Sequence, residues 1–129
     1  MVNNLSKQSE KASDFLKKEV GEVPKHAVVL EKYDAQVSDA LQTMRTKILG
    51  DGKLSKKTKE LIRIGIATSI RLPKDPFARL HAFAAVKAGA TPEEVHEAVE
   101  VALLICGLSG YAEYGYAVVQ EAENVSKGA

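Results

Sequence analysis

The sequence has few cysteines, few aromatic residues and no surplus of charge. Its 129 residues include one Cys, no Trp, three Phe and four Tyr. The single thiol, Cys106, excludes an intramolecular disulfide and a two-thiol redox pair within the chain. Lys and Arg number 18 against 17 Asp and Glu, a net charge of +1. Without a basic field, neither nucleic acid nor an anionic membrane surface is an expected partner.

Long apolar runs are also missing. None reaches the roughly 18 residues that a membrane-spanning helix needs. The polar start, Met1 to Lys11, lacks the apolar core of a secretion signal, so we expect a cytoplasmic protein. No stretch alternates with a period of two and no internal repeat occurs, so the fold class is predicted to be all-α. This length indicates one domain with one core.

The first half of the chain has helical periodicity. Residues 4–19 place apolar side chains among Lys and Glu, as in an amphipathic helix with a solvated charged face. Residues 25–49 repeat apolar positions at intervals of three and four, which predicts one long helix or two collinear ones. The glycines of residues 50–52 then mark a turn.

The second half shows clearer helix boundaries. Ser55 is placed to cap a helix that continues through Arg71. Residues 91–94, Thr-Pro-Glu-Glu, form a capping-box sequence that opens a helix to Ile105. The Gly-rich residues 106–110 interrupt the pattern, and residues 111–124 predict the last helix. Together these segments predict a bundle of about six helices.

The central helix is predicted over residues 75–89. Asp75 is placed to cap it, Pro76 suits the first helical position, and Gly89 suits a left-handed stop. Its sides are apolar nearly all round, which indicates a buried helix. His81 lies on its small-residue face, one turn after Phe77. A titratable imidazole in such a helix is the first candidate functional group.

Four segments occur in an order that resembles one family. They are residues 54–62 (Leu-Ser-Lys-Lys-Thr-Lys-Glu-Leu-Ile), 79–81 (Arg-Leu-His), 88–95 (Ala-Gly-Ala-Thr-Pro-Glu-Glu-Val) and 106–110 (Cys-Gly-Leu-Ser-Gly). The chain is similar to the carboxymuconolactone decarboxylase family, which includes the alkylhydroperoxidase D-like proteins. The resemblance covers residues 54–125 as the family core, with residues 1–53 as N-terminal helices of the same domain. It implies a small helical unit that assembles as a trimer or hexamer.

The peroxidase branch of this family uses a glutamate, a Cys-x-x-Cys pair and a histidine. By resemblance Glu60 and His81 fall on the glutamate and the histidine, whereas Lys74 and Phe77 occupy the two cysteine positions. A disulfide-cycling peroxidase needs an attacking and a resolving thiol. A thiol-dependent alkylhydroperoxidase is therefore disfavoured, and Cys106 is interpreted as a small buried hydrophobe.

The decarboxylase branch lacks the thiols and has the Arg-x-His sequence that residues 79–81 reproduce. The resemblance therefore implies a cofactor-independent lyase, without a metal, acting on a small carboxylated lactone or related acid. Decarboxylation needs an apolar site for the departing carboxylate, a cation for any second carboxylate, and an acid. His81 suits the acid because its ordinary pKa lies near neutrality. The alternative for His81 is a core histidine bonded to a backbone carbonyl.

Glu60 is the predicted partner of His81, but helix geometry does not guarantee contact. An antiparallel pairing of their helices leaves the two residues offset by about 7 Å. Contact therefore requires a tilted crossing or a bridging water. The alternative for Glu60 is a helix-surface ion pair with Arg63 or Lys56.

Three further residues are candidates for substrate binding: Arg79, Phe77 and Tyr111. Arg79 suits an anion clamp, yet it points about 200° away from His81 on a helix, so an interface or surface ion pair is an equal alternative. Tyr111 adjoins the Gly-rich break, and its alternative is a core or interface tyrosine. His26 and His96 are expected to be solvated, and a site combining His81, Glu60 and His96 lacks metal-ligand spacing.

Two hypotheses about function stay open at this stage. One is the lyase with His81 as proton donor or acceptor and Glu60 orienting it. The other is a non-catalytic oligomeric scaffold or small-ligand binder that keeps the fold. A catalytic His81 should lie in a solvent-reachable cavity lined by at least one more polar group, whereas a scaffold should hold a sealed imidazole whose hydrogen bonds are satisfied.

Overall fold

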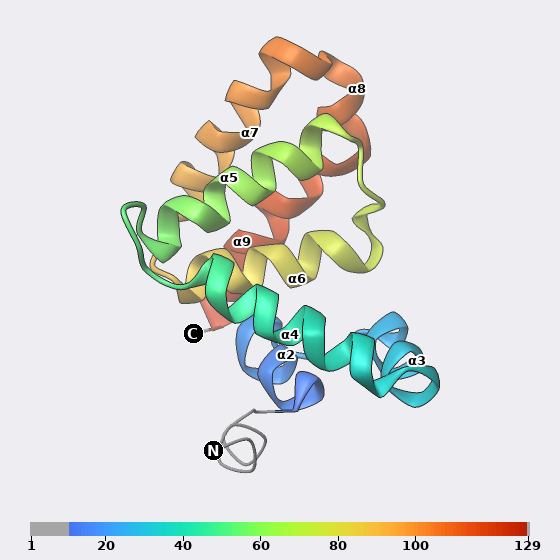
Figure 1. Cartoon of the computed structure of the whole chain (residues 1–129). Helices are drawn as coiled ribbons and strands as arrows, with labels where there is room; N and C mark the ends of the chain where they lie inside the picture. Colours follow the sequence, from blue (N-terminus) through green and yellow to red (C-terminus); the bar gives the residue numbers. More distant parts are fainter. Residues whose placement is uncertain (1–10, 129) are drawn as a thin grey trace. The chain divides into compact units, whose positions relative to one another are not determined.

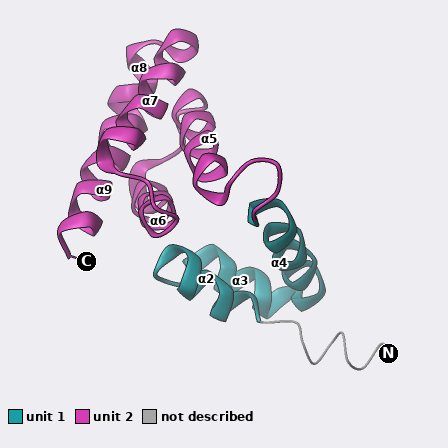
Figure 2. Ribbon diagram, turned by 90° about the vertical axis from the view of Figure 1, so that its left-hand side faces the viewer, with its two compact units in different colours: residues 1–50 teal, residues 51–129 magenta. Residues whose placement is uncertain are grey.

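The computed structural model describes residues 11–128, and every regular element in that range is helical (Figure 1). The predicted all-α fold is therefore confirmed. Residues 11–50 and 51–128 form two compact units, which we call unit 1 and unit 2 (Figure 2). The start of the helix predicted from residue 4 lies outside the described residues.

Unit 1 contains α2 (Ala12–Val20), α3 (Lys25–Tyr33) and α4 (Ala35–Leu49). The prediction of one long helix or two collinear helices over residues 25–49 is wrong, because the backbone leaves helical geometry at Asp34. The Asp34 side chain accepts a hydrogen bond from Val37 N at 3.1 Å and caps α4. Figure 1 shows α3 and α4 running in different directions. The described range thus holds seven helices of nine residues or more instead of about six.

Unit 2 contains α5 (Lys56–Ser69), α6 (Lys74–Lys87), α7 (Pro92–Cys106), α8 (Leu108–Gly110), the π-helix η1 (Tyr111–Gly115) and α9 (Tyr116–Gly128). The most extensive packing joins α6 to α9 and α5 to α7, and α7 also packs on α9. Small and branched side chains from these four long helices and η1 form the core, including Ile64, Ala82, Ala85, Val95, Val99, Tyr114 and Val118. The central helix that the sequence predicts to be buried is α6, and it has more buried alanines than any other described helix.

Three helix ends of unit 2 follow the predicted capping signals, whereas α5 ends at Ser69 and not at Arg71. Ser55 accepts from Thr58 N, and Thr91 and Glu94 form both bonds of a capping box. Gly89 has a φ of 104°, the left-handed conformation expected of a stop. Asp75 is extended, with φ −103° and ψ 120°, so the regular turns of α6 begin at Pro76 as expected.

The last predicted helix differs from expectation at its start. Residues 111–115 form a π-helix instead of an α-helix. Two glycines explain the close packing there. A Cβ at Gly115 would lie 2.6 Å from Val99 Cγ1, and a Cβ at Gly110 would lie 2.5 Å from the backbone oxygen of Thr68. Only glycine allows η1 to approach α5 and α7 so closely.

We predict that Gly115→Ala destabilises the protein by about 1–3 kcal/mol, the usual cost of overpacking, despite the better helix propensity of alanine. Val99 and Thr68 are fully buried and have little room to move. Urea unfolding followed by circular dichroism measures the effect. The control is Gly52→Ala, where the nearest atom is the flexible Nζ of Lys59 at 3.5 Å. Equal stability of the two variants would show that η1 is not closely packed.

Candidate functional site

His81 lies in the second regular turn of α6, partly exposed, with its ring facing η1. Its Nδ1 lies 2.8 Å from the hydroxyl oxygen of Tyr114. The His81 and Tyr114 rings meet edge to face, with centroids 6.1 Å apart. The centroid of the Phe77 ring also lies 6.1 Å from that of His81. The imidazole therefore bonds a side-chain hydroxyl from a distant segment and not a backbone carbonyl.

The π-helix η1 places Tyr114 in the core. Tyr114 has no exposed surface, and its ring belongs to the hydrophobic core of unit 2. A π-helix has an extra residue per turn, and such segments are frequent at functional sites. Sequence periodicity treated Tyr114 as an ordinary position of an α-helix, so its contact with His81 was missed.

Glu60 lies in the second turn of α5 and is completely buried. Its Oε2 accepts a hydrogen bond from Arg63 Nη2 at 2.5 Å. Oε1 of Glu60 and Nε of Arg63 are buried and have no hydrogen-bond partner among the described residues. The pairing with Arg63 was anticipated as the alternative for Glu60, but the carboxylate lies in the interior and not on the helix surface. Losing one partner of such a pair leaves an uncompensated buried charge.

The two pairs form one electrostatic cluster, which we call the His81 cluster: Glu60, Arg63, His81 and Tyr114. Burial, followed by the positive charge of Arg63, lowers the pKa of His81 from its ordinary 6.5 to about 3. Burial raises the pKa of Tyr114, Arg63 opposes that shift, and Glu60 adds to it. At neutral pH the imidazole and the phenol are therefore both uncharged. Glu60 influences this region together with Arg63, and no described hydrogen bond joins it to His81.

The other predicted binding residues lie in different places. Phe77 is beside His81, as expected from the helix register. The Tyr111 hydroxyl lies 2.9 Å from His96 Nε2 instead, and His96 Nδ1 lies 3.3 Å from Glu100. His96 is thus bonded as well as partly exposed.

Arg79 is exposed and lines a pocket of about 180 Å³ between α6 and α9. In that pocket Lys74 Nζ donates to the Tyr116 hydroxyl at 2.9 Å. Arg79 and His81 therefore serve different surfaces of α6, as the angle of about 200° between them requires.

Cys106, at the end of α7, is partly exposed and free. The interpretation as a buried hydrophobe is therefore only partly right. Its thiol donates to the neighbouring Gly107 carbonyl oxygen at 3.4 Å. Within residues 11–128, no three His, Cys, Asp or Glu side chains are grouped to hold a metal ion. The same range has no helix both long and apolar enough to cross a membrane.

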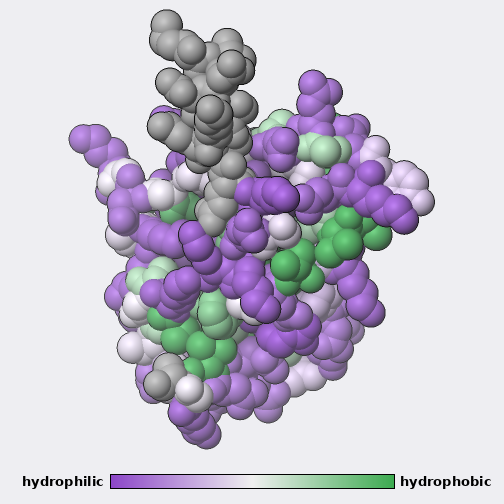
Figure 3. Space-filling view, turned by 90° about the horizontal axis from the view of Figure 1, so that it is seen from below, coloured by the Kyte–Doolittle hydropathy of each residue, from purple (hydrophilic) through white to green (hydrophobic). Residues whose placement is uncertain are grey.

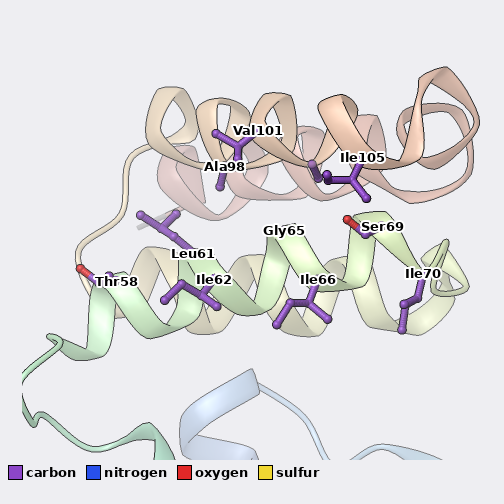
Figure 4. Close-up of a pocket in the computed structure, with 11 residues that line it drawn as sticks. Thr58, Leu61, Ile62, Gly65, Ile66, Ser69, Ile70, Ala98, Val101 and Ile105 are labelled. Carbon is purple, nitrogen blue, oxygen red and sulfur yellow. The ribbon is translucent and has the colours of Figure 1, made fainter.

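A second surface feature is an apolar groove between α5 and α7, with a volume of about 470 Å³ (Figure 4). No charged residue lines it, and Thr58 and Ser69 contribute its only side-chain hydroxyls. The aliphatic lining includes Leu61, Ile62, Ile66, Ile70, Val101 and Ile105. Four of these side chains are more than half exposed, namely Ile66, Ile70, Val101 and Ile105.

Comparison with known proteins gives a consistent result. Residues 35–121 match the model of the carboxymuconolactone decarboxylase family. The fold is similar to a crystal structure from Burkholderia xenovorans LB400 that bears the name of the same family, with a TM-score of 0.80 and 24% sequence identity. The similarity covers 99% of this chain and 96% of that one. No curated protein sequence matches the chain.

We predict that His81 makes stability pH-dependent. Its pKa is about 3 in the folded protein and near 6.5 when unfolded, so the unfolded chain binds the proton first. The stabilisation is complete above pH ~6.5 and is lost as the pH falls toward 3, at roughly 1 kcal/mol per pH unit. Between pH ~7 and ~5, the free energy of unfolding measured in urea should therefore fall more steeply in the parent protein than in His81→Gln. Parallel pH profiles would contradict a buried, neutral ring.

Proposed function

Since the chain belongs to the carboxymuconolactone decarboxylase family, we propose that it is a cofactor-independent lyase that decarboxylates a small carboxylated lactone or related acid. The observation that carries the proposal is the His81 cluster, where a partly exposed imidazole bonds a buried tyrosine beside the pair of buried Glu60 and partly exposed Arg63. A scaffold needs no such group of buried polar side chains, because their desolvation costs free energy.

The reaction requires one bond to break and one to form. The carbon–carboxylate bond breaks, CO2 leaves, and the electron pair left on carbon takes up a proton. We assign the transfer of this proton to Nε2 of His81, which has no hydrogen-bond partner among the described residues while its ring is partly exposed. Phe77 supplies an apolar wall beside the ring, where a departing carboxylate is poorly solvated.

Arg63 replaces Arg79 as the proposed anion-binding group. Its side chain is 30% exposed, one end bonds Glu60, and its Nε has no partner among the described residues. A guanidinium can bind a carboxylate while it stays paired on its other edge. Glu60 thus acts in the proposal by holding Arg63, and orients His81 only indirectly.

We also propose that the protein acts as a homo-oligomer, a trimer or hexamer, in which a second copy covers the apolar groove. The groove is free of charge and has exposed branched side chains along both of its helices, so a copy of the same ridges can interdigitate with it. By contrast, the face in Figure 3 is mainly hydrophilic, with small, separate apolar patches. A copy of the chain is always present at matching concentration, which favours it over other occupants.

We predict that turnover depends on His81. CO2 release is measured with 4-carboxymuconolactone and a panel of other small carboxylated lactones. Replacing His81 by Gln should lower kcat by about 100-fold or more, the usual contribution of a general acid or base. His26→Gln, an exposed position of α3, should retain full activity. An unchanged rate in His81→Gln would remove this residue from the mechanism, and no turnover of any lactone would favour the non-catalytic scaffold.

We predict that assembly depends on the apolar groove. The mass in solution, from light scattering after size exclusion, should be that of a trimer or hexamer and should fall in Ile66→Glu, because a buried unpaired carboxylate is costly at an apolar interface. Val29→Glu is the matched control, since Val29 in unit 1 is 56% exposed and Ile66 is 58% exposed. A monomeric parent protein, or the same loss in both variants, would argue against the groove as the interface.

A further inference from the structure

The hydroxyl of Tyr114 has one hydrogen-bond partner among the described residues, Nδ1 of His81 at 2.8 Å. Tyr114 is completely buried, so solvent does not compete for its proton. A phenol carries one donor, and leaving a buried donor unpaired costs about 1–3 kcal/mol. The hydroxyl therefore donates to the imidazole nitrogen and does not accept from it.

A neutral imidazole carries a single proton, on one of its two nitrogens. Nδ1 accepts from Tyr114, so it has no proton of its own. We propose that Tyr114 holds His81 in the tautomer protonated at Nε2, so that the ring offers the substrate a neutral N–H donor. The tautomer is inferred from the hydrogen bond between Tyr114 and His81 alone, whereas its role toward a substrate rests on the proposed function.

The charges that face the ring agree with this assignment. Arg63 is the cation near His81, and it opposes the doubly protonated imidazolium. Glu60 is paired with Arg63, so its negative charge is already compensated. Tyr114 keeps its proton because burial raises its pKa. The chain thus disfavours both the imidazolium and the phenolate in the resting state.

The ligand class follows from the donor. An Nε2 proton hydrogen-bonds to an acceptor oxygen, such as a lactone carbonyl, an enolate or a carboxylate. A lactone carbonyl gains negative charge when the bond to an adjacent carboxylate breaks, and a neutral donor aimed at that oxygen stabilises the charge. Ligands that present only donors have no partner at this position.

The tautomer also determines where the proton comes from. When carbon takes the Nε2 proton, the Tyr114 proton moves to Nδ1, so the ring stays neutral. The Nδ1 proton then returns to the Tyr114 oxygen, and Nε2 of the partly exposed ring takes up a proton from water, which restores the starting tautomer. In total, the carboxylate and one water yield CO2, the protonated product and hydroxide. Tyr114 is a positioning residue in this scheme, because it acts through His81.

The experiment is long-range proton–nitrogen correlation NMR of protein labelled with nitrogen-15 in histidine. His81 signals are assigned by their loss in His81→Gln. We expect a protonated, pyrrole-like Nε2 and an unprotonated, pyridine-like Nδ1 at neutral pH. A protonated Nδ1 in the parent protein would overturn the proposal, and this reading needs no variant of Tyr114.

Tyr114→Phe is the test variant, and its His81 nitrogen signals should move toward a mixture of the two tautomers. Tyr116→Phe is the control, because its hydroxyl bonds Lys74 and lies on the following helix. Signals that stay the same in a folded Tyr114→Phe protein would contradict a tautomer set by Tyr114.

Turnover provides a second and separate readout. On a lactone that the parent protein decarboxylates, Tyr114→Phe should lower kcat by roughly 10-fold to 100-fold and leave KM nearly unchanged, since it does not touch the substrate. A rise in KM by the same factor as the fall in kcat would contradict the positioning role. If no lactone is turned over, the proposed function fails, while the nitrogen spectra still decide the tautomer.

Discussion

The buried hydroxyl of Tyr114 must find a hydrogen-bond partner inside unit 2, and His81 provides it. That one bond joins η1 to α6 across the core. Its formation depends on close packing, because Gly110 and Gly115 bring η1 against α5 and α7 at distances that a Cβ would prevent. The polar contact and the glycine contacts therefore act together: the backbone approach places the phenol, and the phenol orients the ring.

The pair of buried Glu60 and partly exposed Arg63 places a compensated charge near that bond. Burying a carboxylate completely is unfavourable unless a partner stays with it, and Arg63, whose side chain is 30% exposed, is that partner for Glu60. Burial, together with the positive charge of Arg63, leaves His81 uncharged in the resting protein. This arrangement differs from a histidine that merely fills space, because the charge of Arg63 acts on the ionisation of both His81 and Tyr114.

The apolar groove between α5 and α7 is a different kind of feature. The helices leave Ile66, Ile70, Val101 and Ile105 largely exposed although the core beneath them is closed by Ile64, Val95 and Val99. Each of the two helices therefore has an inner and an outer apolar side. The inner sides stabilise unit 2, and the outer sides line the groove for which we propose a second copy as the occupant.

Local sequence signals determined the all-α class, most helix ends and the family. Ser55, Thr91 with Glu94, and Gly89 act through neighbours within a few residues, so their roles can be read without a structure. Asp34 shows the limit of this reading, because a cap inside an apolar periodic run looks like one more helical position. For the site, the sequence singled out His81, Phe77 and Glu60, but it offered Tyr111, and not Tyr114, as the candidate tyrosine.

Tertiary structure alone decided which tyrosine meets the imidazole. Tyr111 and Tyr114 are three residues apart, and the extra residue in the π-turn sets which of the two hydroxyls points at α6 and which at His96. Tertiary structure also decided that Glu60 is buried. In the sequence, an i, i+3 pair with Arg63 has the same spacing on a buried helix face as on a solvated one. Residue types and spacing determine what can bond locally, whereas long-range packing determines which polar groups lose their water.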